Sequence, residues 1–181
     1  MMLSSGLSVA GLGASIGVGL IFLTAGAEKL RHRALLPGVI ANYRLLPERM
    51  TGPVAAILPF AEVAVGAGLI VGLRPAPVLI AMLLLITFAV AMAINIGRGR
   101  RHIDCGCGGP ELRQPLGWPL VLRNLALVAL LLPRLLPSPA LSGVDIFTAA
   151  AAGIGAFVGY MLFQTIGGLI ASPTHSIASR R

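Results

Sequence analysis

Long apolar segments follow one another along almost the whole chain, separated by short polar connections. A membrane-spanning helix needs about 20 apolar residues, and the chain holds candidates at Leu7–Glu28, Pro53–Leu73, Ala76–Ile96, Gly117–Leu136 and Val144–Ala171. Lipid offers the backbone no hydrogen bonds, so spanning segments of this kind must be helices that pack in a bundle. The pattern predicts an all-α integral membrane protein with one domain over residues 1–181.

The composition supports this class. Hydrophobic residues make up 56% of the chain and charged residues only 11%, whereas a soluble domain carries about 25% charged residues. The net charge of +8 could suggest a nucleic-acid partner. The basic residues stand at the ends of the apolar segments, however, where they anchor and orient helices. We therefore expect membrane lipid as the surroundings and no nucleic acid. The first segment lacks the basic start and cleavage site of a signal peptide, so we expect it to span.

Spacing within the segments predicts how the helices pack. Glycines four residues apart let two helices approach closely, and such pairs occur at Gly13 and Gly17 and at Gly155 and Gly159. The alternative is that these are glycines of the kind common in any membrane helix. Pro59 lies inside the second segment, and we expect it to kink that helix.

Charge predicts an orientation that conflicts with the candidate chemistry. With five spans, one side of the membrane receives Lys29, Arg31, Arg33, Arg44, Arg49, Arg98, Arg100, Arg101, Arg113, Arg180 and Arg181, and the other only Arg74 and Arg134. Basic connections stay in the cytoplasm, which favours a cytoplasmic location for the loop of residues 98–116. Disulfide chemistry is easier outside, so both orientations remain open.

Few polar side chains lie within the predicted spans, and these are functional candidates by default. The candidates are Glu28, Lys29, Glu62, Asn95, Arg123 and Asn124, and all six fall in the half of the bilayer next to the loop of residues 98–116. Glu62 needs a partner from another helix, for which Arg123 is the first choice and Lys29 the second. Two interpretations stay open: a buried ion pair that fixes helix register, or a proton relay or ligand contact.

The loop of residues 98–116 contains both cysteines of the chain, Cys105 and Cys107. A thiolate is the reactive form of cysteine and is favoured by nearby cations, which Arg98, Arg100, Arg101 and His102 could supply. The negative charge of Asp104 would disfavour the thiolate, unless Asp104 serves as a base or pairs with Arg101. A disulfide between residues two apart closes a strained ring, which suits exchange better than bracing.

Three interpretations of the cysteines follow. They shuttle between dithiol and disulfide, or they bind Cu(I) or Zn(II) together with His102 and Asp104, or they are unreactive thiols in a tight turn. Two thiolates would need further ligands, and the chain has no second cysteine pair. We therefore favour redox exchange and assign no metal ligand.

Several short motifs resemble a known family in order and spacing. They are Thr24–Leu30, Tyr43–Pro47, Pro59–Glu62, Asn95–Arg100, Asp104–Gly109 and Arg123–Asn124. Over roughly residues 15–135 the chain is similar to the methylamine-utilisation membrane proteins of the MauE family, within the wider DoxX-like group. Gly109 departs from the pattern, because a bulkier residue is expected there.

The resemblance implies a DoxX-like four-helix transmembrane bundle with a C-terminal fifth helix. It also implies thiol–disulfide handling with a thioredoxin-like partner during maturation of a disulfide-rich client. Cys105 and Cys107 would be the catalytic pair, and Glu28, Glu62, Asn95, Arg123 and Asn124 would shape the site beneath them. Methylamine need not be the pathway, since the family occurs in many genomic contexts.

The leading hypothesis is a membrane redox accessory protein, with enzymatic thiol–disulfide oxidoreductase activity left undecided. Electrons could pass on to a quinone near Glu62 and Arg123, although the sequence carries no quinone motif. The alternatives are a structural or assembly subunit of a larger membrane complex and a soft-metal-binding membrane module. We expect an integral protein of the cell membrane, most simply the bacterial inner membrane.

Overall fold

The computed structural model describes residues 2–106, 115–137 and 141–171. Its elements are α1 (Met2–Arg31), α2 (Leu36–Asn42), α3 (Glu48–Ile70), α4 (Ala76–Gly97), α5 (Trp118–Leu131), the 3-10 turn η1 (Leu132–Leu135) and α6 (Gly143–Ala171). Within the described residues, five helical stretches are long and apolar enough to cross a membrane. The prediction of an all-α membrane protein is confirmed, and likeness to the DoxX group stays a prediction.

The helix ends agree with the predicted spans at most positions. The third span begins at Ala76 as expected and ends at Gly97. The second starts earlier, at Glu48, and remains one helix to Ile70 although it contains Pro59. The fourth becomes a 3-10 turn from Leu132. The reason is Pro133, because proline has no backbone N–H to donate the hydrogen bond that would continue an α-helix. The kink at Pro59 stays a prediction.

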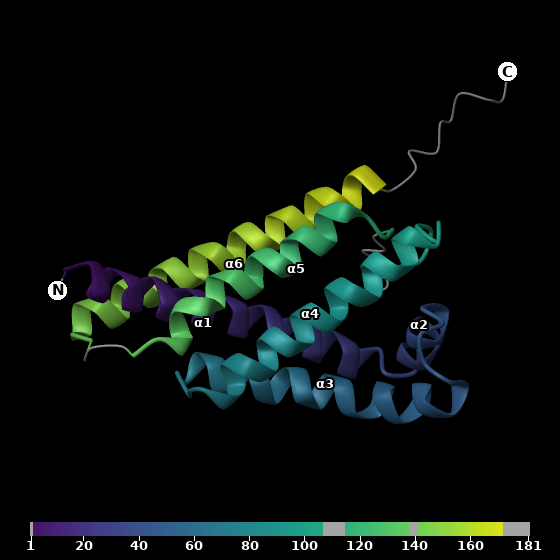
Figure 1. The fold of residues 1–181 in the computed structure, drawn as a ribbon, viewed down its shortest axis with the longest axis horizontal. Coiled ribbons are helices and arrows are strands. Elements are labelled where there is room, and N and C mark those ends of the chain that lie inside the picture. The colour runs from purple at the N-terminus through teal and green to yellow at the C-terminus, as the bar shows by residue number, and fades with distance from the viewer. Residues whose placement is uncertain (1, 107–114, 138–140, 172–181) are drawn as a thin grey trace, which may run out of the picture.

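Helix α1 is the central element of the bundle. It packs along α3 and α6, while α4 packs on α5. Figure 1 shows the end of α1, the start of α3 and the end of α4 at the same end of the molecule as the short helix α2. The N-terminus and the start of α6 lie at the opposite end. This arrangement gathers the predicted polar positions of several helices at one end of the bundle.

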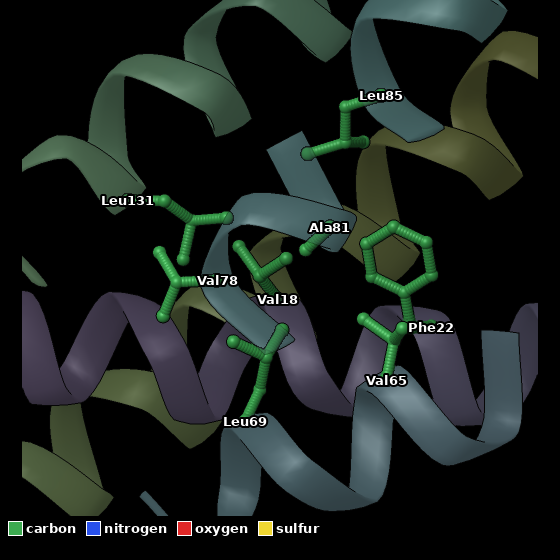
Figure 2. Packing of buried hydrophobic residues seen from close by; sticks show 8 residues of the cluster. All are labelled: Val18, Phe22, Val65, Leu69, Val78, Ala81, Leu85 and Leu131. Carbon is green, nitrogen blue, oxygen red and sulfur yellow. The ribbon is translucent and has the colours of Figure 1, made fainter. Parts of the chain in front are cut away.

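The middle of the bundle is a cluster of aliphatic and aromatic side chains from four helices (Figure 2). Its members are Val18 and Phe22 of α1, Val65 and Leu69 of α3, Val78, Ala81 and Leu85 of α4, and Leu131 of α5. Many other large apolar side chains point outward and are exposed. In a soluble protein that much exposed apolar surface would promote aggregation, whereas in a bilayer it contacts lipid.

Glycine contacts explain how α1 approaches its neighbours so closely. A Cβ atom on Gly17 would stand 2.9 Å from the carbonyl oxygen of Gly153 in α6, and one on Gly153 would stand 2.6 Å from that of Gly13. The prediction of close packing is therefore confirmed for Gly13 and Gly17. Gly155 and Gly159 make no such contact with the described part of this chain, because a Cβ atom added to either would meet nothing there within 4 Å; Gly153 provides the contact from α6.

Candidate functional site

The cysteine loop leaves α4 through a glycine turn. Gly99 has a positive φ of 76°, a conformation that glycine adopts without steric cost at the end of a helix. The backbone N–H of Arg100 then donates to the carbonyl oxygen of Asn95 at 2.9 Å. This bond satisfies a carbonyl at the helix end and sends the chain back across the end of the bundle.

The next residues are fixed to the start of α5. The N–H of Leu116 donates to the carbonyl oxygens of Arg101 and Ile103, at 2.9 and 3.1 Å. Ile103 and Leu116 are buried in a second apolar cluster, against which the half-buried Cys105 packs. The members of this cluster are Ala89, Met92, Ile96, Ile103, Leu116, Leu120 and Val121. The backbone N–H of Gly106 donates to Asp104 Oδ1 at 3.3 Å. Cys105 is thus held on an ordered turn, and Cys107 lies outside the described residues.

Helix α2 covers this turn from the other side, and the sequence did not predict it. The hydroxyl of Tyr43, at the end of α2, donates to the carbonyl oxygen of Cys105 at 3.1 Å. Val39, one turn earlier, is so close that a Cβ on Gly106 would stand 3.0 Å from its Cγ1. The signals were Pro37 in the first turn of the helix, a favoured position for proline, and the position of Tyr43 within one of the quoted motifs.

Arg100 connects α2 to α4. Its guanidinium donates to Oδ1 of Asn95 at 3.1 Å and to the carbonyl oxygen of Asn42 at 2.8 Å, with a longer contact of 3.5 Å to the carbonyl oxygen of Tyr43. The Asn95 side chain is fully buried. A planar guanidinium suits several acceptors at once, so Arg100 fixes α2 over the loop. The sequence indicated Arg100 only as a source of positive charge.

A buried ion pair lies between α1 and α3. Nζ of Lys29 stands 2.9 Å from the Glu62 carboxylate, and the two side chains are 12% and 1% exposed. The same Nζ lies 6.0 Å from the ring centroid of Phe88 in α4. Phe88 packs against the same apolar cluster as Cys105, which makes the cluster the physical link between the ion pair and the loop.

The predicted ranking of partners for Glu62 is wrong, because the second choice, Lys29, forms the ion pair. Arg123 of α5 instead donates to Oε1 of Gln164 in α6 at 2.5 Å, and its guanidinium carbon lies 5.1 Å from the ring centroid of Tyr160. Arg123 therefore connects α5 to α6. Its neighbour Asn124 is buried and donates to the carbonyl oxygen of Leu120 within its own helix.

The remaining predicted residues lie nearer the surface of the same end. Glu28 contacts Arg31 and His32, each at 3.4 Å. Arg98 reaches the carbonyl oxygen of Arg44 at 3.5 Å, and Arg101 and His102 are exposed. Over residues 2–106, 115–137 and 141–171, no three His, Cys, Asp or Glu side chains come together as a metal site. The metal interpretation also involves Cys107, which is not described.

The fold and this site define a class: a small helical membrane protein with a cysteine turn held over one end of its bundle. The chain belongs to the family described as methylamine utilisation protein MauE, whose family model matches residues 7–137. It is 42% identical over 166 residues to the MauE protein of Paracoccus denitrificans, covering 88% of each chain. It is 41% identical to that of Paracoccus versutus, covering 82% of each. No solved structure matches the chain significantly.

Proposed function

We propose that this protein is a membrane thiol–disulfide redox accessory protein that supports disulfide formation or maturation of a partner in methylamine utilisation. The observation that carries the proposal is the half-buried Cys105, which is fixed on a turn at the end of the bundle by the hydroxyl of Tyr43 and by packing against the second apolar cluster. Cys107 follows two residues later in the sequence. The family, named for methylamine utilisation, supports the pathway.

The exchange balances as a two-electron transfer. A client thiolate attacks one sulfur of the Cys105–Cys107 disulfide, which breaks the S–S bond and forms a mixed disulfide. A second client thiolate then displaces the cysteine sulfur, so the client loses two electrons and two protons and the pair becomes a dithiol. A thioredoxin-like disulfide protein, or a quinone as the second option, reoxidises the dithiol. Run in reverse, the same steps reduce a client disulfide.

Thiol trapping in cells tests the proposal. Membranes are quenched with acid, alkylated and analysed before and after a pulse of reductant. We expect the wild-type pair to change redox state, and the Cys107→Ser variant to accumulate a mixed disulfide with a partner through Cys105. The matched control is the double variant Cys105→Ser, Cys107→Ser, which cannot form that adduct. If the wild-type pair never changes state and the double variant matures its client normally, the redox role is wrong.

Orientation has its own test. The charge count favours a cytoplasmic location for the cysteine end, in a bacterial inner membrane. We therefore expect a membrane-impermeant maleimide to label Cys105 of the Cys107→Ser variant in inverted vesicles and not in intact cells. Labelling in intact cells would reverse the orientation and would favour oxidative maturation of an exported client.

A structural or assembly role is the second candidate, favoured by the outer face of α6. Gly155 and Gly159 point to open space on this face, and their spacing suits a closely approaching helix of another subunit. This role predicts a complex of fixed stoichiometry in mild detergent, which survives Cys105→Ser and dissociates when Gly155 and Gly159 are both changed to Leu.

A further inference from the structure

Val39 of α2 and Tyr43, the residue that directly follows this helix, both contact the cysteine turn. Val39 and Tyr43 are four residues apart, a spacing that aligns side chains along a helix. Val39 packs against Gly106, and the Tyr43 hydroxyl donates to the carbonyl oxygen of Cys105. Tyr43 and Cys105 both pack against the second apolar cluster. The conformation of the turn therefore depends on where α2 lies.

The position of α2 in turn depends on Arg100. This side chain accepts no hydrogen bonds and donates at 3.1 Å to the buried Asn95 and at 2.8 Å to the last residue of α2, Asn42. The anchor is rigid, because Asn95 is fully buried and its amide nitrogen is itself bonded to the carbonyl oxygen of Ala91. A continuous set of hydrogen bonds thus runs from α4 through Arg100 and α2 to the peptide of Cys105.

We propose that Tyr43 and Arg100 are positioning residues that control access to the Cys105 thiol. Arg100 fixes the end of α2, and Tyr43 holds the Cys105 peptide so that Cys105 stays half-buried until α2 moves. Attack on or by a partner sulfur requires an accessible sulfur atom, so displacement of α2 is a step of the exchange. The inference rests on the proposed function in taking this thiol to be the one that reacts.

The test measures the rate at which N-ethylmaleimide alkylates Cys105 in detergent-solubilised full-length protein. The background is Cys107→Ser, so that one sulfur reacts. Tyr43→Phe keeps the ring and removes the hydroxyl, and loss of one hydrogen bond should accelerate alkylation about two- to tenfold. The factor should be the same across the pH–rate profile, because access changes while the charge near the sulfur does not. The melting temperature is measured alongside.

Arg100→Lys separates positioning from charge. A lysine keeps the positive charge but cannot reach the acceptors on α4 and α2 together, so we expect it to accelerate alkylation as Tyr43→Phe does. If Arg100 acts through charge alone, Arg100→Lys leaves the rate unchanged, and its assignment as a positioning residue is wrong. The controls are Tyr160→Phe, at the second tyrosine of the chain, and Arg33→Lys, at an exposed arginine; neither should alter the rate.

An unchanged rate in Tyr43→Phe would overturn the inference, as would an equal acceleration in Tyr160→Phe, which would indicate general loosening of the bundle. The measurement needs no partner and no disulfide. Failure of the redox proposal therefore appears in the trapping experiment in cells, whereas failure of the positioning inference appears in these rates.

Discussion

The ion pair of Lys29 and Glu62 offers the sharpest test of what holds the bundle together near the cysteine loop. Its closest N–O distance is 2.9 Å, and the Glu62 side chain is 1% exposed. Lys29→Met removes the cation and leaves the carboxylate buried on α3. Breaking a buried pair from one side costs about 3–5 kcal/mol. At about 2–4 °C per kcal/mol for a chain of this size, the melting temperature should fall by roughly 6–20 °C.

Replacing Lys29 and replacing Glu62 should not cost the same amount of stability. Lys29 lies near the end of α1, which finishes at Arg31, and a lysine there can turn its ammonium toward the lipid–water boundary. Glu62 lies well inside α3 and has no comparable route to water. Glu62→Gln also keeps a polar group that Lys29 can contact. We therefore expect Glu62→Gln to cost only about 1–2 kcal/mol, clearly less than Lys29→Met.

A double-mutant cycle of Lys29→Met, Glu62→Met and the variant that carries both supplies the decisive comparison. Lys29→Met combined with Glu62→Met replaces both charges with apolar side chains, which is often neutral for a buried pair, so most of the lost stability should return. Unfolding in detergent is followed by circular dichroism and by the fluorescence of Trp118, the only tryptophan. Arg31→Met is the matched control, because it breaks an exposed pair with Glu28 that contributes at most about 1 kcal/mol.

Two results would refute this reasoning: a Lys29→Met variant as stable as Arg31→Met, or a double variant whose loss equals the sum of the single losses. The cycle also separates the two interpretations of the pair. A stable double variant that still supports client maturation shows that the pair fixes helix register. A stable double variant without that function indicates a proton relay or ligand contact.

Two further predictions concern α6: the first tests its packing against α1, and the second tests the hydrogen bonds at its first turn. Gly153→Ala should cost about 1–3 kcal/mol, because the new methyl group would meet the backbone of α1, with the carbonyl oxygen of Gly13 at 2.6 Å. Gly155→Ala should be neutral, because its methyl group would meet nothing within 4 Å among the described residues. Equal losses of stability in thermal unfolding would contradict the contact at Gly153. Ser142→Ala should cost about 0.5–2 kcal/mol. At the start of α6 the hydroxyl of Ser142 accepts from the N–H of Asp145, and the Asp145 carboxylate accepts from the N–H of Ser142, in the manner of a capping box. Faster proteolysis at this helix start would report the loss.

The sequence predicted the spans well because their main determinant is local. A run of apolar residues long enough to cross a bilayer must be helical whatever surrounds it. Helix α2 escaped prediction for the complementary reason: with seven residues it is too short to span, and a helix of that length depends on tertiary contacts for its stability. The contacts that fix it, from Arg100 and Tyr43, join residues far apart in the sequence.

The ion-pair partner of Glu62 depends on which helices are neighbours, and the apolar pattern does not specify this. In the structure, Gly26 of α1 determines which helix lies beside Glu62. A Cβ on Gly26 would stand 2.7 Å from Cγ2 of Val63 and 2.9 Å from the carbonyl oxygen of Pro59, so only glycine lets α1 approach α3 at the level of Glu62. Lys29 follows Gly26 by three residues, nearly one helical turn, and is brought beside the carboxylate. Arg123 projects from α5 toward α6 instead. The close approach of α1 and α3, more than the charges themselves, determines which cation Glu62 receives.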